Sequence, residues 1–299
     1  MAKTALTIGN FDGVHLGHAA VIHAARRVAE PGGRVIAMTF DPAPAVVFQP
    51  QTPRRQLTTM ATRINLLQSL GVDEVVVQTI DRAWLGQSPE EFIAGSVLPR
   101  GADVLVEGPD FRFGKVRAGD IEVLRDLGRR FGFEVETVPS VLAAISTLEQ
   151  VPVRSSCIRW LLMQGRVQDA ARLLGRAWRM EGTVARGDQR GRTIGCPTAN
   201  LEPVDLLLPA DGVYAGTARC EDGVFPAAVS IGTKPTFEGS PRVFEAHLIG
   251  WDGPTDHYGW HLQVDLHRWL RDQVSFESTA ALQEQITRDL EAAASVPIA

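Results

Sequence analysis

Two histidines, His15 and His18, stand in the segment Thr-Ile-Gly-Asn-Phe-Asp-Gly-Val-His-Leu-Gly-His at residues 7–18. The apolar residues 5–8 are typical of a buried strand, and residues 19–28 have the pattern of a helix. A strand, a glycine-rich turn and a helix N-terminus together form a phosphate site, because the first backbone N–H groups of the helix point at the ligand. Imidazoles there can donate hydrogen bonds to a triphosphate as charge builds on it. The segment therefore predicts phosphate chemistry, with an ordinary strand–helix turn carrying surface histidines as the alternative.

Other polar segments of the first half also follow apolar runs. They are Gly9, Asn10 and Asp12 beside the histidines, Thr-Phe-Asp-Pro-Ala-Pro at 39–44, and Gly-Pro-Asp-Phe-Arg-Phe-Gly at 108–114. Ligands of parallel sheets bind beyond the carboxyl ends of the strands, so we expect these segments to line one crevice. Phe111 is suited to stacking on a planar ring, although for its segment alone the packing of two phenylalanines is favoured.

A second phosphate-binding segment is predicted at residues 155–159, where a helix begins. The hydroxyl of Ser156 and the helix amides can hold a phosphate, and Arg159 adds a bidentate guanidinium. The commoner use of such residues is a serine N-cap with a solvated arginine. The pairing of this segment with the histidine turn in one alternating domain favours the phosphate interpretation.

The second half carries a different cluster. Residues 187–195 contain three glycines and two arginines and form a loop able to wrap phosphate, and Thr198 and Asn200 follow it. Their neutral oxygens suit Mg²⁺, a hard ion that takes few protein ligands and completes its shell with phosphate and water. Glu245, in an alternating strand, is a candidate general base for an alcohol. Alternation by itself favours a solvated, outward-facing residue at Glu245.

The elements that must position these groups fall into two patterns. Apolar runs at 5–8, 35–40, 74–77, 104–106 and 133–138 alternate with helical stretches, which predicts a parallel sheet covered on both faces. Two short helices are expected within 155–175. Short strands separated by turns then recur from residue 179, which predicts an antiparallel barrel closed by a C-terminal helix. The predicted domains are residues 1–178 and 179–299.

The composition excludes several classes of protein. The 299-residue chain has a formal net charge of −5 with both signs interspersed, so no basic nucleic-acid surface is expected. Its three cysteines form no CxxC pair, which argues against a disulfide framework or a zinc site. No run approaches the ~18 apolar residues of a membrane helix. We therefore expect a cytoplasmic monomer or weak homo-oligomer that binds small molecules, neither nucleic acid nor membrane.

The ordered set of motifs resembles the bifunctional bacterial riboflavin kinase/FMN adenylyltransferases. In the first half, these motifs are the histidine segment (the HxGH pattern of nucleotidyltransferases), Thr-Phe-Asp-Pro, Asp-Phe-Arg-Phe-Gly and Ser-Ser-x-x-Arg. In the second half they are Gly-Arg-Thr-x-Gly-x-Pro-Thr-Ala-Asn, Leu-Pro-Ala-Asp-Gly-Val-Tyr at 208–214, Ile-Gly-x-x-Pro-Thr-Phe at 231–237 and Glu245. The resemblance covers nearly the whole chain.

This resemblance implies two reactions that both use ATP. In the barrel, ATP phosphorylates riboflavin to FMN, with Glu245 as base and Thr198 and Asn200 holding Mg²⁺. In the first domain, a Rossmann-like nucleotidyltransferase, FMN attacks a second ATP to give FAD and pyrophosphate, with His15, His18, Ser156 and Arg159 stabilising the phosphates. The implied nucleotide- and flavin-binding residues are Gly9, Asn10, Phe11, Asp12, Gly17, Asp110, Phe111, Gly187, Arg192, Gly195 and Arg271.

The chain departs from the family pattern at several positions. Ala43 replaces the histidine of Thr-Phe-Asp-Pro-His-Pro, Glu107 and Pro109 surround a family glycine, and Cys196 replaces an aromatic residue. One hydroxyl and one cation also differ in the segment 154–157. Most of these changes lie in the first domain. They leave open a riboflavin kinase whose adenylyltransferase site is weakened or lost, and a non-catalytic flavin sensor is a further alternative.

Overall fold

The computed structural model describes residues 2–51, 55–187, 195–202, 205–233, 242–254 and 256–296. The chain divides into two compact units. One comprises Met1–Ala143 with Gln150–Ser155, and the other comprises Ala144–Glu149 with Ser156–Ala299. None of the helices in the described ranges is long and apolar enough to cross a membrane.

A five-stranded parallel sheet forms the centre of the first unit, in the order β3-β2-β1-β4-β5. Its elements are β1 (Thr4–Ile8), α1 (Leu16–Ala29), β2 (Arg34–Asp41), α2 (Pro44–Phe48), α3 (Met60–Ser69), β3 (Glu74–Thr79), α4 (Arg82–Leu85), α5 (Pro89–Phe92), the turns Ile93–Val97 and Leu98–Arg100, β4 (Val104–Glu107), the turn Lys115–Arg117, α6 (Ile121–Phe131) and β5 (Glu134–Thr137). The strand order reverses direction between β1 and β4. That point is where open parallel sheets bind their ligands.

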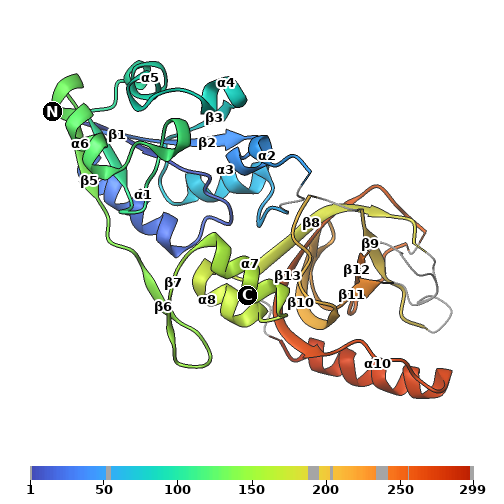
Figure 1. Ribbon diagram of the computed structural model, residues 1–299. Helices are drawn as coiled ribbons and strands as arrows, with labels where there is room; N and C mark the ends of the chain where they lie inside the picture. Colours follow the sequence, from blue (N-terminus) through green and yellow to red (C-terminus); the bar gives the residue numbers. More distant parts are fainter. Residues whose placement is uncertain are drawn as a thin grey trace. The chain divides into compact units, whose positions relative to one another are not determined.

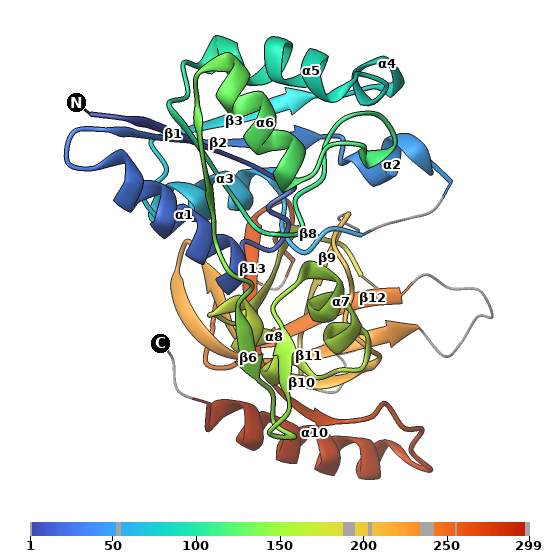
Figure 2. The same ribbon diagram turned by 60° about the vertical axis from the view of Figure 1, so that its left-hand side comes forward.

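Helices cover both faces of this sheet, as Figure 2 shows, with α1 and α3 on one side and α4, α5 and α6 on the other. Successive strand residues point to opposite faces, so both faces of β2 are apolar. Val35 and Ala37 pack in the cluster that contains residues of α1 and α3. Ile36 and Met38 pack in the cluster that contains residues of α5 and α6.

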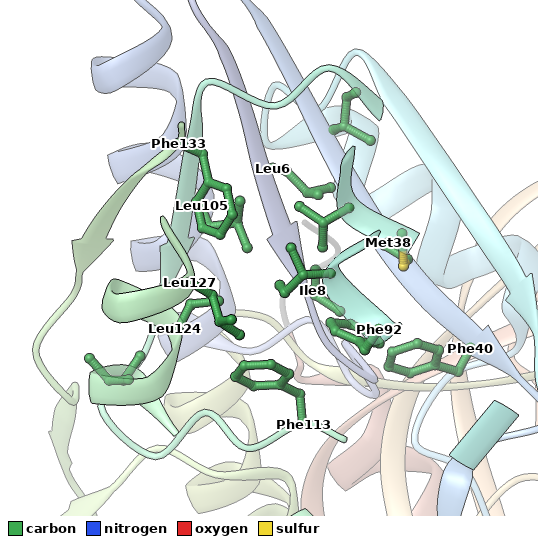
Figure 3. Close-up of a cluster of buried hydrophobic side chains, with 14 of the residues drawn as sticks. Leu6, Ile8, Met38, Phe40, Phe92, Leu105, Phe113, Leu124, Leu127 and Phe133 are labelled. Atoms are coloured by element: carbon green, nitrogen blue, oxygen red, sulfur yellow. The ribbon is translucent and has the colours of Figure 1, made fainter. Parts of the chain in front are cut away.

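The second of these clusters lies on one face of the sheet and extends to the carboxyl ends of the strands (Figure 3). It brings strand residues such as Leu6 and Ile8 against Phe92, Phe113 and Leu124. Each side chain of this size contributes roughly 1.5–3 kcal/mol when it is removed from water. The aromatic residues therefore anchor the loop after β4 to the sheet and hold that end of the crevice in place.

The second unit contains a closed barrel in the order β10-β11-β12-β9-β8-β13 (Figure 1). After the two-stranded ribbon β6 (Leu142–Ala144) and β7 (Gln150–Pro152), the elements are α7 (Ser155–Met163), α8 (Val167–Leu174), β8 (Trp178–Ala185), β9 (Ala199–Leu201), β10 (Gly212–Cys220), β11 (Gly223–Thr233), β12 (Arg242–Leu248), β13 (His261–Arg271) and α10 (Thr279–Ala294). Neighbouring barrel strands are antiparallel. Helix α10 packs on β10 and β11.

The predicted fold class is confirmed: a parallel α/β domain precedes an antiparallel barrel and a C-terminal helix. The five expected strands of the first half and the two short helices after residue 155 are present. The sequence did not predict β9, which is only three residues long and pairs with β8 and β12. It did not predict the ribbon β6–β7 either.

Candidate active sites

The two histidines cap the helix that follows β1. His15 is the N-cap of α1, and its ring nitrogen Nδ1 accepts from the backbone N–H of His18 at 3.3 Å. In return, Nδ1 of His18 accepts from the backbone N–H of His15 at 3.3 Å. The two rings stack with their centroids 3.6 Å apart and an interplanar angle of 13°. The pair therefore forms a capping box made of imidazoles.

This arrangement assigns the ring protons. A neutral imidazole has one N–H donor and one acceptor nitrogen, and in both rings Nδ1 is the acceptor. The proton of each neutral ring therefore sits on Nε2. Gly17 permits the packing, because a Cβ there would lie 3.1 Å from the His15 ring and 3.2 Å from the Val153 carbonyl oxygen. Both rings at the helix N-terminus therefore carry an Nε2–H group that is able to donate.

The loop between β1 and α1 has a strained backbone. Phe11, Gly13 and Val14 have φ values of 45°, 85° and 38°. Left-handed backbone is costly for a bulky residue and especially for a β-branched one, so the surrounding structure must impose it. Such strain is typical of loops whose groups are held ready for a ligand.

Asp12 is the residue that holds this loop. Its carboxylate is buried and accepts from the backbone N–H groups of Leu57 at 2.9 Å and Thr58 at 3.3 Å. The buried guanidinium of Arg63 lies 3.4 Å away and forms an ion pair with it. The hydroxyl of Ser155 donates to the Asp12 carbonyl oxygen at 2.9 Å. These contacts give Asp12 a structural part in shaping the turn.

A cavity of about 240 Å³ opens beside the histidine pair. Seven of the predicted residues line it: Gly9, Phe11, His15, Gly17, His18, Asp110 and Phe111. Two others, Asn10 and Asp12, are outside its lining. Its remaining wall is largely apolar and includes Val21, Val138 and Val153. A cavity lined by hydrogen-bond donors and by apolar side chains suits a nucleotide.

Ser156 and Arg159 lie on α7, which passes into the second unit after Ser155. His15 and His18 belong to the first unit, and Ser156 and Arg159 belong to the second. The role of Ser156 and Arg159 in phosphate binding therefore stays a prediction. Their neighbour Ser155 belongs to the first unit, where its hydroxyl supports the Asp12 loop.

Glu107, at the end of β4, also lines the cavity, and the sequence analysis did not predict it as a site residue. It is 4% exposed, and its Oε1 accepts from the Ile8 N–H at 2.6 Å. Burial raises the pKa of this carboxyl well above its ordinary value of 4.5, while the Ile8 hydrogen bond acts in the opposite direction. An acidic residue that ends an apolar strand was the signal available in the sequence.

The raised pKa of Glu107 predicts a pH-dependent stability. Below the ordinary value of 4.5 the carboxyl is neutral in both folded and unfolded chains, and its contribution to stability is fully present. As pH rises toward the folded pKa, ionisation favours the unfolded chain and that contribution is lost. We expect Glu107→Gln to unfold at a higher temperature than the wild type, with a gap that widens as pH rises. The difference between the free energies of unfolding of Glu107→Gln and the wild type should grow by at most about 1.4 kcal/mol per pH unit.

Thermal unfolding followed by circular dichroism between about pH 5 and 8 measures this gap. The matched control is Glu136→Gln, because Glu136 is an exposed glutamate on the neighbouring strand β5. Its difference from the wild type should not change with pH. A constant gap for Glu107→Gln would contradict a raised pKa.

In the barrel, two predicted residues face each other across adjacent strands. Glu245 on β12 pairs in register with Asn200 on β9 and, on its other side, with Ser230 on β11. Directly opposite residues of antiparallel strands point to the same side of the sheet with Cβ atoms about 4.5–5.5 Å apart. Phe244 and Ala246 are buried, whereas Glu245 is half-buried on the opposite face. The fold therefore places the candidate base and a candidate Mg²⁺ ligand next to each other.

Close packing holds in place the segment 197–200, which carries the candidate Mg²⁺ ligands Thr198 and Asn200. A Cβ at Gly187 would lie 2.4 Å from the side-chain nitrogen of Asn200, so a larger residue at position 187 would displace this amide. The His247 ring bonds through Nδ1 to the Pro197 carbonyl oxygen at 2.7 Å. A carbonyl only accepts, so Nδ1 carries the proton in this contact. The neutral oxygens of Thr198 and Asn200 fit the ligands that Mg²⁺ takes.

The remaining predicted residues of the barrel lie at different places. Gly195 has a positive φ of 81°. Arg192 lies outside the described residues. The guanidinium of Arg271 forms a bidentate ion pair with Asp289 of α10, with Nη2 2.7 Å from Oδ2 and Nε 3.1 Å from Oδ1. Arg271 thus fastens the C-terminal helix to β13, and its predicted contact with flavin stays a prediction.

Comparisons with known proteins identify the family of each half of the chain. The FAD synthetase family model matches residues 1–153, and the riboflavin kinase model matches residues 174–296. The bifunctional riboflavin kinase/FMN adenylyltransferase of Escherichia coli (strain K12) is 34% identical over 290 residues, which are 95% of this chain and 90% of that protein.

Two further similarities extend over the same length. The bifunctional riboflavin kinase/FMN adenylyltransferase of Bacillus subtilis (strain 168) is 33% identical over 96% of this chain and 90% of its own. A solved structure described as a macrolide-efflux protein from Streptococcus pneumoniae has a TM-score of 0.88 and 29% identity, and the match covers 99% of this chain and 95% of that one. The two family models and the relatives that match over nearly the whole chain agree, and the chain belongs to the bifunctional riboflavin kinase/FMN adenylyltransferase family.

Proposed function

We propose that this protein makes FAD from riboflavin in two ATP-dependent steps, one in each predicted domain (residues 1–178 and 179–299), as a cytoplasmic monomer or weak homo-oligomer. Membership of the family over nearly the whole chain supports an enzyme with both activities. The observation that carries the proposal is that predicted site residues come together in each half of the chain. In the first half they form the stacked histidine cap beside a cavity, and in the second half they form the register pair of Glu245 and Asn200.

In the kinase step, Glu245 accepts the proton of the riboflavin 5′-hydroxyl as that oxygen attacks the γ-phosphorus of ATP. The bond from this phosphorus to the bridging oxygen breaks, and ADP leaves. Thr198 and Asn200 would hold Mg²⁺, which neutralises charge on the ATP phosphates. Gly187 lies against the side chain of Asn200 and limits the positions that this amide can take. The contribution of the protein is positioning and electrostatics.

In the adenylyl step, a phosphate oxygen of FMN attacks the α-phosphorus of ATP, and the bond to the β-phosphate bridging oxygen breaks. Pyrophosphate leaves with the electron pair of that bond. The Nε2–H donors of His15 and His18 and the amides of α1 stabilise the negative charge that develops on the phosphates. Ser156 and Arg159 would add a hydroxyl and a guanidinium. The protein needs no nucleophile of its own, because FMN attacks directly.

Product analysis from two starting compounds tests this function. With ATP and Mg²⁺, riboflavin should yield FMN and then FAD, and FMN should yield FAD with one pyrophosphate per turnover. Chelation of Mg²⁺ should stop FMN formation, because the barrel oxygens cannot neutralise the triphosphate alone. Chromatography of the flavins and a pyrophosphate assay measure both steps. FMN without FAD would support the kinase-only alternative, and riboflavin binding without turnover would support the sensor.

A further inference from the structure

Glu107 occupies the point where two central strands separate. The register between β1 and β4 runs from Ala5–Val104 to Leu6–Leu105, whereas β4 stays paired with β5 as far as Glu107–Thr137. Beyond Leu6, the Ile8 N–H therefore bonds to the side chain of Glu107 at 2.6 Å instead of to a backbone carbonyl of β4. The carboxyl lies at the reversal of strand order, where ligands of such sheets bind.

Only one of its two oxygens has a partner among the described residues. Oε1 accepts from Ile8, and no described group donates to Oε2. Glu107 is not among the described residues with a side-chain polar atom that is both buried from solvent and without a hydrogen-bond partner. Since Glu107 lines the cavity, Oε2 reaches the cavity surface. The residue therefore offers the cavity one oxygen, while the other is fixed to the sheet.

The charges around Glu107 give its carboxylate no direct partner. Strand β1 contains no titratable side chain, and Glu134 and Glu136 on β5 are exposed. In the described lining of the cavity, the other titratable groups are His15, His18, Asp110 and Arg154. The last two form an ion pair with each other. An ionised Glu107 would therefore be buried without a compensating charge and would also repel a triphosphate held at the histidine turn.

We propose that Glu107 acts as a neutral carboxylic acid whose O–H donates a hydrogen bond to an acceptor oxygen of the nucleotide in the cavity. This inference rests on the proposed adenylyl transfer and adds a nucleotide-binding residue to it. The acid accepts from Ile8 with Oε1 and donates from Oε2, so both oxygens are satisfied when the nucleotide is bound. The raised pKa agrees with this form of the group.

The pH profile of FAD formation from FMN and ATP tests the inference on the full-length protein. Glu107→Gln keeps an acceptor for Ile8 and a donor toward the cavity at every pH, whereas the wild type loses its donor as the acid ionises. The ratio of kcat/KM for ATP, variant over wild type, should therefore rise with pH, by up to tenfold per pH unit above the pKa of the acid. Ionisation of ATP and FMN affects the wild type and the variant equally, so it cancels in this ratio.

A second variant separates binding from a structural role. Glu107→Leu removes the donor and should raise the KM for ATP about tenfold relative to Glu107→Gln, the effect of one hydrogen bond to a charged group. FMN formation from riboflavin, measured on the same preparations, reports whether the rest of the chain is intact. A structural role alone would leave the ratio for Glu107→Gln independent of pH.

The outcomes are distinguishable. A ratio that rises with pH supports the inference. A flat ratio in a protein that makes FAD overturns it and leaves the proposed function intact. Loss of FAD formation in Glu107→Gln at every pH, with FMN formation unchanged, would show that the ionised carboxylate is the working form and would also overturn it. A wild type that makes no FAD from FMN at any pH overturns both proposals.

Discussion

Glu245→Gln should reduce FMN formation from riboflavin by about 10²–10⁴-fold and leave FAD formation from FMN unchanged. The amide keeps the size of the side chain and its place in register with Asn200, but it cannot take the proton of the attacking hydroxyl. Loss of the base acts on kcat, because the proton moves in the transition state, so the KM for riboflavin should change much less. Initial rates of each half-reaction, followed by chromatography of the flavins, measure the effect.

The matched control for this variant is Glu202→Gln. Glu202 is an exposed glutamate directly after β9, so the same chemical change occurs one residue beyond the end of that strand. Both reactions should proceed at wild-type rates in the control. Equal loss of FMN formation and FMN adenylylation in Glu245→Gln would contradict the assignment of the two reactions to separate sites.

His18→Ala should have the opposite effect, with FAD formation lost and FMN formation spared. Removal of one preorganised donor from an oxyanion-type site typically costs about 10²–10³-fold in kcat. The same substitution removes half of the capping box and the ring that stacks on His15. Alanine therefore reports on both the donor and the helix cap, and a second substitution must separate them.

His18→Asn makes that separation. Its short side chain can place an acceptor near the position of Nδ1 and so keep the bond from the His15 N–H, but it has nothing at the position of Nε2. We expect His18→Asn to unfold near the wild-type temperature and still lose FAD formation. His23→Ala is the control, because His23 is an exposed histidine of the same helix. A His18→Asn variant with wild-type FAD formation would remove His18 from the adenylyl step.

The local pattern of the chain was enough to predict most of the fold. The runs that became β1, β2 and β4 are continuous and apolar because both faces of each strand are buried, and this composition is visible without the structure. β9 could not be found in this way. It has three residues, and the neighbouring strands on both sides satisfy its backbone, so its stability comes from partners distant in sequence.

The roles of single polar residues were harder to predict. Asp12 belongs to the same motif as the histidines, yet its carboxylate is directed at Leu57, Thr58 and Arg63, which come together with it only in the folded domain. Arg271 likewise forms an ion pair with Asp289, 18 residues further along. A charged side chain bonds to whichever group the fold buries beside it, and sequence spacing does not specify that group.

The sequence by itself determined the family and the two kinds of phosphate chemistry and predicted the residue types for them, because these depend on side-chain chemistry and on order along the chain. Only the tertiary structure decided which nitrogen of each histidine carries the proton and which residue faces Glu245. It also decided that Glu107 is buried at the carboxyl end of β4. Protonation and hydrogen bonding depend on burial and on neighbours in space. Both arise only when strands that are distant in sequence pack together.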